Sequence, residues 1–234
     1  MKSDRLFVAF SLILTMVGSC WGQGTIDKDS RSLITAVLSK AKVSGSISYW
    51  GRCGYRDVLP DLPNARAPRE KLGSVSPVQA LREMFADNPK MQVTEDANGV
   101  IRMVESGVPR DLLDVRISHI SFKDPRGRDG IWIPRQARRL IVSAPEIRAF
   151  MRDNGINWPS EGEYINDIYG GPDPSRPHVT GDLYDVTLAD AMDYVSKTFP
   201  GFWVYENCRR ENGTRVVFFE IFGSIRKQLT SLSN

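Results

Sequence analysis

An internal repeat constrains this chain more than any other feature, because a repeated unit fixes the architecture before single elements are assigned. Residues 72–95 align without a gap with residues 183–206, at a constant offset of 111 positions. Six of the 24 aligned positions are identical, and several others pair similar apolar residues. The sequence therefore predicts two copies of one small structural unit. The identical pairs are Leu72/Leu183, Val75/Val186, Ala80/Ala191, Pro89/Pro200, Val93/Val204 and Glu95/Glu206.

Each copy begins with the signals of a capped helix. Ser76 and Thr187 are preferred N-cap residues, and Gln79, three positions after Ser76, can complete a capping box. Asp190 is a weaker substitute at the matching position of the second copy. Apolar residues follow at helical spacing in both copies, and a proline then blocks further helix. We expect one amphipathic helix in each copy.

A β-hairpin is expected after each helix. Runs of strand-forming residues flank Asn98-Gly99 in the first copy and Asn212-Gly213 in the second. Asn-Gly favours a tight turn because both residues adopt positive φ at little cost, so we prefer a turn to glycosylation at the Asn-Gly-Thr sequon of Asn212. Another strand is expected upstream, at residues 46–50 in the first copy and 178–183 in the second. The unit is then strand, helix, hairpin.

These units predict an α+β fold. It consists of two small strand–helix–hairpin modules, with a helix on one face of each sheet and an irregular segment between them. The first module also carries an N-terminal helix. The expected divisions are a signal peptide at 1–22, the first module at 23–107, a connecting strand, helix and loop at 108–177, the second module at 178–225 and a polar tail at 226–234.

The pattern of the two copies resembles a known family. An apolar strand ending in leucine, a Val-Ser or Val-Thr step, a capped helix with Ala-Leu or Ala-Met, and a short hairpin are similar to the short N-terminal domain (STN) of secretins and TonB-dependent receptors. The resemblance covers residues 72–104 and 178–220 as two degenerate copies. It implies a periplasmic module that engages protein partners. We identify no plug, barrel or secretin core here, so no pore or receptor activity is carried over.

The N-terminus has the pattern of an export signal. Lys2 and Arg5 precede an apolar run at residues 6–17, and small residues follow, with cleavage expected after Gly22. The apolar run is too short for a membrane span, which needs about 20 residues. In the alternative, residues 17–20 form a lipobox and Cys20 carries a lipid. We therefore expect a periplasmic or secreted protein, associated with a membrane only if Cys20 is lipidated.

Cysteine usage agrees with export. Cys53 and Cys208 remain after cleavage, and a pair of cysteines in an oxidising compartment normally forms a disulfide. Such a bridge closes a loop of about 155 residues, worth about 5 kcal/mol in the chain-entropy model before any native strain is subtracted. The alternative is two separate buried thiols.

The segment between the copies does not repeat. Residues 112–122 have the pattern of a strand buried on both faces, and residues 144–152 that of a helix. Residues 158–177 are rich in Gly, Pro, Asp and Tyr and predict a long loop. Since loops carry function more often than frameworks do, this loop is a candidate binding region. Its candidate binding residues are Trp158, Tyr164 and Tyr169.

The densest basic stretch of the chain, residues 126–139, offers a second candidate. Arg138 and Arg139 belong to it, and Trp132 lies among the arginines. One interpretation is a surface that binds anionic lipid headgroups or cell-wall polymer. The other is a solvated face partly balanced by Asp124 and Asp129, which we favour.

No pattern of catalytic or metal-ligating residues stands out. The two histidines, His119 and His178, are 59 positions apart, and neither lies in a His-Glu-x-x-His pattern. No Gly-x-Ser-x-Gly motif or phosphate-binding glycine loop occurs, so we expect no catalysis, cofactor or metal. The formal net charge of +3 at pH 7 argues against bulk binding of nucleic acid.

The sequence thus favours an exported envelope protein that acts as a protein-binding or adaptor module. The alternative is a protein that binds or hydrolyses cell-wall polymer or polysaccharide through the loop at 158–177.

Overall fold

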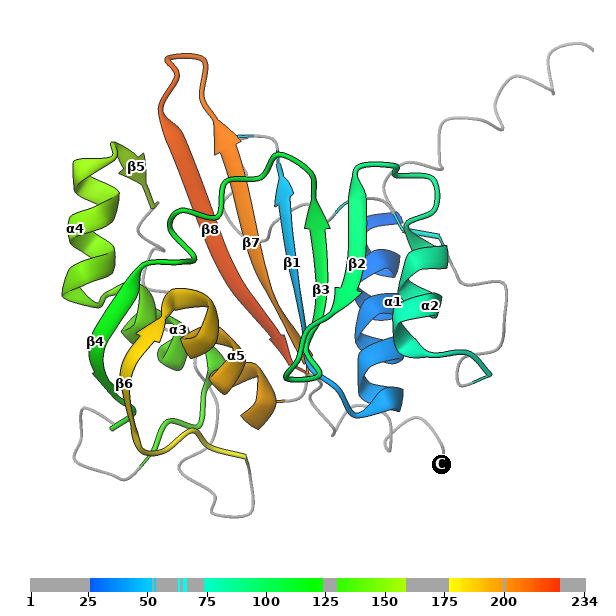
Figure 1. Cartoon of the computed structure of the whole chain (residues 1–234), viewed down its shortest axis with the longest axis horizontal. Helices are drawn as coiled ribbons and strands as arrows, with labels where there is room; N and C mark the ends of the chain where they lie inside the picture. The colour runs from blue at the N-terminus through cyan, green and yellow to red at the C-terminus, as the bar shows by residue number, and fades with distance from the viewer. Residues whose placement is uncertain are drawn as a thin grey trace, which may run out of the picture.

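The structure is a computed structural model that describes residues 26–51, 53, 63, 65–66, 74–123, 130–158, 177–199 and 201–223. Over these residues the fold is α+β, as the sequence predicts, with five helices and two β-sheets (Figure 1). The signal peptide with Cys20, the polar tail, Tyr164 and Tyr169 lie outside the described residues.

The first half of the chain supplies two helices and three strands. α1 spans Ile26–Ala41 and is followed by β1, Gly45–Trp50. α2 spans Pro77–Met84. The hairpin after it consists of β2, Met91–Glu95, and β3, Ile101–Glu105.

The second half is larger because it holds additional elements before its helix and hairpin. β4 is shorter than the predicted strand at 112–122, since residues 111–114 form turns. α4 matches the predicted helix, whereas α3 was not expected. The elements are β4 Arg116–Ser121, α3 Pro134–Val142, α4 Pro145–Asp153, β5 Ile156–Asn157, β6 Asp182–Thr187, α5 Leu188–Thr198, β7 Gly201–Arg209 and β8 Arg215–Gly223.

One six-stranded sheet runs through both halves, in the order β2-β3-β1-β7-β8-β5. This differs from the expectation of one small sheet per copy. β1 pairs in parallel with β3 on one side and with β7 on the other, so that Ile47 lies opposite both Met103 and Val204. The backbone groups of β1 therefore bond to both copies at once, and the two hairpins become parts of a continuous sheet.

The helix and hairpin of each copy follow the sequence prediction. α2 begins at Pro77 and α5 begins 111 positions later, at Leu188. The Ser76 hydroxyl accepts the Gln79 N–H at 3.2 Å. Thr187 and Asp190 form a complete capping box, so the copy that seemed weaker in the sequence has the fuller cap.

The tight turns also agree with the sequence. Gly99 and Gly213 adopt positive φ, of 74° and 81°, and connect the two strands of each hairpin. A side chain at either position would strain the backbone in this left-handed region.

The strand upstream of the second copy corrects a prediction. β6 begins at Asp182 rather than His178, because Gly181 has a φ of 89° and Val179 forms only an isolated bridge with Ile131. β6 pairs with β4 in the separate two-stranded sheet. β5 has the place in the second copy that β1 has in the first. β1 pairs in parallel with β3, and β5 pairs in parallel with β8. A helix precedes each of them, α1 before β1 and α4 before β5.

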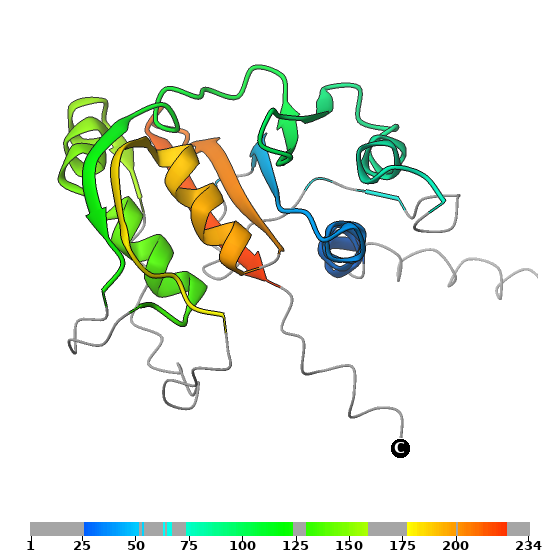
Figure 2. The same cartoon turned by 60° about the horizontal axis from the view of Figure 1, so that its bottom comes forward.

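Two hydrophobic cores lie on opposite faces of the large sheet. Alternate residues of β7 enter different cores, Phe202 and Val204 with α1 and α2, and Trp203 and Tyr205 with α3 and α5. In Figure 2, α5 lies across β7 and β8. The strands β4 and β6 lie on one side of α5, and the helices α1 and α2 lie on the opposite side. α3 and α5 thus pack on the face of the large sheet opposite α1 and α2, with the β4–β6 sheet beside them.

The disulfide expected from the sequence is present in the structure. Cys53 is bonded to Cys208, and their Cα atoms are 5.3 Å apart. Next to it, the Gly51 N–H donates to the Asn207 carbonyl at 2.7 Å, which continues the β1–β7 pairing. The bridge therefore fastens the chain after β1 to the strand that belongs to the second copy.

No helix in the described part of the chain has both the length and the apolar character needed to cross a bilayer.

Candidate functional site

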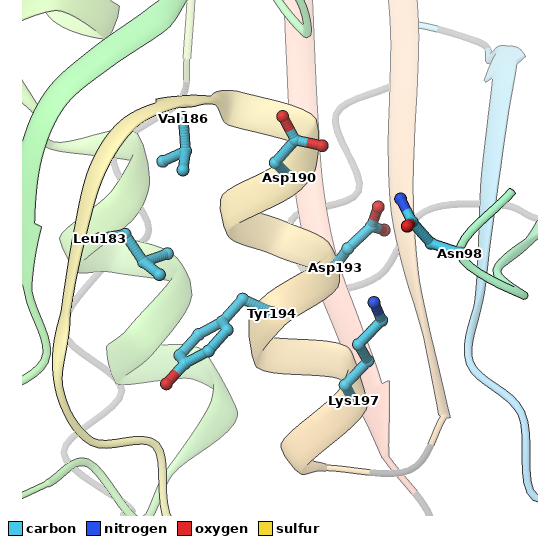
Figure 3. Close-up of a pocket in the computed structure, with 7 residues that line it drawn as sticks. All are labelled: Asn98, Leu183, Val186, Asp190, Asp193, Tyr194 and Lys197. Carbon is cyan, nitrogen blue, oxygen red and sulfur yellow. The ribbon is translucent and has the colours of Figure 1, made fainter. Parts of the chain in front are cut away.

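A shallow groove with a volume of about 230 Å³ lies over the outer face of α5 (Figure 3). β6 borders it on one side, and the turn between β2 and β3 borders it on the other. Both copies of the repeat therefore contribute to it. The residues that line the groove are Asn98, Leu183, Val186, Asp190, Asp193, Tyr194 and Lys197.

The floor of the groove is the polar stripe of α5. Asp193, Tyr194 and Lys197 follow Asp190 by three, four and seven positions, a spacing that places the four residues on one side of the helix. The opposite side of α5 carries the apolar residues predicted from the sequence, which are buried in the α3/α5 core. Because the apolar side of α5 packs into this core, the polar stripe faces away from the core.

Asp193 is the buried member of the stripe and joins the two copies. Only 6% of its surface is exposed. Its carboxylate accepts a hydrogen bond of 2.8 Å from Arg102 Nη1 and one of 2.7 Å from Trp203 Nε1, and a second contact joins it to Arg102 Nη2. Burial alone would lower the pKa of Arg102, but its bonds to Asp193 and Asp96 raise it above the ordinary value.

Asp96 holds the turn that forms the second wall. Its carboxylate accepts the N–H groups of Asn98 and Val100 at 2.8 and 3.0 Å, and it pairs with Arg102 Nη2 at 2.7 Å. Burial would raise the pKa of Asp96, but the hydrogen bonds from Val100 N–H, Arg102 and Asn98 N–H outweigh it and lower that pKa. This turn places Asn98 at the rim.

The β6 side of the groove combines apolar and aromatic residues. Leu183 and Val186 are half-buried beside α5. Tyr184 is 67% exposed and stacks on His119 of β4, with ring centroids 4.8 Å apart. Tyr194 is 37% exposed and donates its hydroxyl to the Thr180 carbonyl at 2.8 Å. Within the described residues, these two tyrosines are the large hydrophobic side chains that remain exposed.

Arg138 corrects a sequence-based interpretation, because it lies neither on a binding surface nor on a solvated face. It is fully buried. α3 places Ala137, Arg138 and Ile141 on its inner side, and Arg138 Nη1 donates to the Phe219 carbonyl of β8 and lies 3.4 Å from Glu220 Oε2. The density of arginines in the sequence does not reveal which one faces the core.

Two other predicted binding residues lie in the described part of the chain, away from the groove. Arg139 is half-buried on α3, and Trp158 is half-buried against the α3/α5 core. Tyr164 and Tyr169 lie outside the described residues, together with most of the loop at 158–177. Of the predicted binding residues that the structure describes, Trp158, Arg138 and Arg139, none lines the groove.

The histidines are separated, and each has an aromatic partner. His119 Nε2 lies 3.0 Å from Asp182 Oδ1 and its ring stacks on Tyr184, whereas His178 stacks on Trp132 at 4.9 Å. Among the described residues, no group of three or more His, Cys, Asp or Glu side chains is arranged to hold a metal ion.

Sequence reasoning missed the groove because it used α5 only as a capped, amphipathic helix. The signal was present in its polar side, where a tyrosine and three charged residues recur at helical spacing. The burial of Asp193 had no such signal, since its partners Arg102 and Trp203 come from β3 and β7.

No protein-family model matches the chain, and comparison with curated proteins and with solved structures also finds no match.

Proposed function

We propose that this chain is an exported envelope protein that binds another protein, and that the groove over α5 is its binding surface. The observation that carries the proposal is the position of the exposed aromatic residues. Tyr184 and Tyr194 lie beside or in the groove, and they are the large hydrophobic side chains left exposed in the described residues. Protein interfaces are enriched in tyrosine, and grouped exposed apolar surface marks contact sites.

The composition of the groove supports a macromolecular partner. Its lining mixes two aliphatic residues, a tyrosine, an amide and charges of both signs. Leu183 and Val186 provide apolar area, while Asp190 and Lys197 are exposed and can set the orientation of a partner. This is the ordinary pattern of an apolar centre with a polar rim.

Two observations support export. The N-terminal residues have the pattern of a signal peptide. The disulfide between Cys53 and Cys208 is the kind of bond that persists in oxidising compartments. We therefore place the protein in the periplasm or outside the cell.

The two-module architecture belongs to the same proposal. The recurrence of helix and hairpin at an offset of 111, and the matching places of β1 and β5, support descent from one duplicated unit. The resemblance to the short N-terminal domain of secretins and TonB-dependent receptors would make that unit a periplasmic, protein-binding one.

A retention assay tests the function. The purified full chain is immobilised, envelope extract is passed over it, and each retained protein is quantified for wild type, for a Tyr184→Ser/Lys197→Glu double variant, and for Ala86→Glu. Ala86 is exposed and occupies the position of Lys197 in the first copy, so its variant is the matched control. We expect retention of a specific protein to fall about tenfold for the double variant, equivalent to roughly 1.4 kcal/mol, and to be unchanged for Ala86→Glu.

Equal retention by all three proteins would contradict the groove as the binding surface. Sedimentation of the chain with purified peptidoglycan, without retention of any protein, would contradict protein binding itself and favour the polysaccharide alternative.

A further inference from the structure

The outer edge of β6 has backbone groups directed away from its only strand neighbour. Directly after β4, the Phe122 N–H donates to the Gly181 carbonyl at 2.9 Å. Within the β4–β6 pair, Ile120 lies opposite Leu183, and Ser121 lies opposite Asp182. Bonded and non-bonded pairs alternate in an antiparallel ladder. Leu183 therefore bonds to β4, whereas the N–H and C=O groups of Asp182 and Tyr184 point to the other side.

That side of β6 faces the groove. Within the described part of the chain, β6 has one strand partner, β4, and its opposite edge lies next to the space over α5 (Figure 3). Leu183 lines the groove from the inner face of the strand, and Tyr184 lies on the outer face. An incoming strand would meet backbone groups along the edge and apolar side chains below it.

We propose that an extended segment of the partner protein adds to β6 as a third strand of the β4–β6 sheet. Its N–H and C=O groups pair with those of Asp182 and Tyr184, and alternate side chains enter the groove over α5. This assignment rests on the proposed protein-binding function and specifies the form of the partner. It is the strand-addition mode of peptide recognition, in which main-chain bonds give affinity and side-chain pockets give selectivity.

The other strand edges of the molecule are less available than the edge of β6. In β2, the Val93 carbonyl already accepts Arg82 Nε at 2.9 Å, and the Met91 N–H donates to the Asn88 carbonyl at 3.0 Å. The edge of β2 is therefore occupied by groups of its own copy. Of the remaining edge strands, β5 has only two residues, and β4 packs against α4, where the Ser118 N–H donates to Glu146 Oε1 at 3.0 Å.

The charges at the two ends of the groove select the sequence of the partner. Asp190 lies in the first turn of α5, next to the Val186 end of β6, and Lys197 lies in the last turn. They are seven helix positions, or about 10 Å, apart, which is close to the roughly 13 Å between the first and third residues on one face of a strand. A strand antiparallel to β6 would place its N-terminal part near Asp190. Its groove-facing residues should then be basic, apolar and acidic, in that order.

The same charges disfavour a second copy of this chain as the added strand. β6 carries Asp182 and Asp185, so two β6 strands placed edge to edge would bring four carboxylates together. Like charges opposite each other on neighbouring strands are destabilising.

Peptide binding to the full chain tests the proposal. The probe is the peptide Thr-Lys-Thr-Val-Thr-Glu-Thr with blocked ends, and its control is Thr-Glu-Thr-Val-Thr-Lys-Thr, which has the same composition and net charge. Dissociation constants are measured by NMR titration. We expect the control to bind about three- to tenfold more weakly, as for two exposed charge pairs. The Lys197→Glu variant should remove most of this preference.

Backbone methylation of the probe separates strand addition from other contacts. The threonines on either side of the valine lie opposite Asp182 and Tyr184, so N-methylation of both should weaken binding at least about tenfold, because bonds to the edge are lost. N-methylation of the valine, whose N–H points away from β6, should change binding less than twofold. Equal losses at both kinds of position, or no binding of any peptide, would overturn strand addition.

Two variants of the protein at Tyr184 provide a second test of strand addition. Tyr184→Pro removes both the ring and the edge N–H, whereas Tyr184→Ser keeps the N–H, and circular dichroism checks that both variants fold. We expect Tyr184→Ser to bind the peptide more weakly but to keep its charge preference, since only the ring is lost, and Tyr184→Pro to lose the charge-dependent binding altogether. If the envelope partner is still retained in a groove-dependent way by Tyr184→Pro, strand addition fails while the protein-binding function stands. Concentration-dependent dimerisation through β6 in place of peptide binding would assign the edge to a second copy.

Discussion

The two helix–hairpin units share a local sequence code but differ in the side chains on the outer face of the helix and in what bonds to the neighbouring strand edge. In the first unit, the Arg66 N–H bonds to the Met84 carbonyl at 2.9 Å, and Arg66 Nε bonds to the Glu83 carbonyl at 3.1 Å. Arg82 of α2 turns to the edge of β2. In the second unit, Tyr194 and Lys197 of α5 remain exposed beside an open strand edge.

In this duplicated unit, the residues that determine the fold therefore differ from the residues that we propose to bind a partner. Caps, apolar stripes and turn glycines recur in both copies and give each the same helix and hairpin. The residues at the outer positions of the two helices differ. The first copy has Gln79, Arg82, Glu83 and Ala86 at the positions that Asp190, Asp193, Tyr194 and Lys197 occupy in the second copy. In the first unit, Arg82 occupies part of the neighbouring strand edge of β2, and we propose that only the second unit accepts a partner.

The largest effect is expected where a covalent bond connects the two units. A Cys53→Ala/Cys208→Ala variant should lose about 2–5 kcal/mol of unfolding free energy, because the bridge limits the unfolded chain over a separation of 155 residues. Urea unfolding of the variant, and of wild type with and without reductant, measures the loss. Reductant should leave the variant unchanged, and a variant as stable as wild type would show that β1–β7 pairing alone holds the units together.

A somewhat smaller effect is expected at the ion pair between the units. Asp193→Ala should cost about 3 kcal/mol, because it leaves the half-enclosed Arg102 guanidinium without one carboxylate and removes the acceptor of the Trp203 N–H. The Asp193→Asn variant keeps an acceptor of similar shape and should lose less. Chemical unfolding ranks the two, and an equal loss for both would indicate that the negative charge, rather than the hydrogen bond to Trp203, stabilises the contact.

The caps allow a direct comparison of the copies. Thr187→Ala and Ser76→Ala should each cost about 0.5–2 kcal/mol, with the larger loss for Thr187, whose capping box with Asp190 is complete. Thr187→Ser, which keeps the hydroxyl, is the control. A larger loss at Ser76 would mean that packing of the first helix, rather than the cap, decides its stability.

The smallest effect concerns the pH dependence of the second half. Hydrogen bonds from Arg215 hold the pKa of Asp111 below its ordinary value. Since the folded pKa is depressed, this stabilisation is present above the ordinary pKa of aspartate, near 3.9, and is lost as the pH falls through the folded pKa. Because the Asp111 side chain is 43% exposed, we expect less than about 1 kcal/mol.

Unfolding of wild type and of Asp111→Asn between pH 2 and 7 checks this expectation. The stability difference should be constant near neutral pH and should vanish at the acid end. A difference that persists at the lowest pH would show that it arises from packing and not from the charge of Asp111.

Local features were predictable from the sequence because their causes are local. The N-caps at Ser76 and Thr187, the turns at Gly99 and Gly213 and the helix at 144–152 each depend on residues a few positions apart. The disulfide could also be predicted, since the expected cleavage after Gly22 leaves only one pairing of cysteines.

Features that depend on distant contacts were not predictable. β1 pairs with both copies, a choice that its own sequence does not encode, and β6 pairs with β4 instead of joining the large sheet. Arg138 is buried because α3 happens to place it against the Phe219 carbonyl. The groove exists because the Asn98 turn of one copy meets α5 of the other.

The central claim is that the second unit, and not the first, presents the binding surface. A photoreactive amino acid placed at position 197, or at the matching position 86, in the full chain tests it in intact cells. We predict a discrete crosslinked protein from position 197 that is lost with Tyr184→Pro, and none from position 86. The same adduct from position 86, or from both positions equally, would contradict the account.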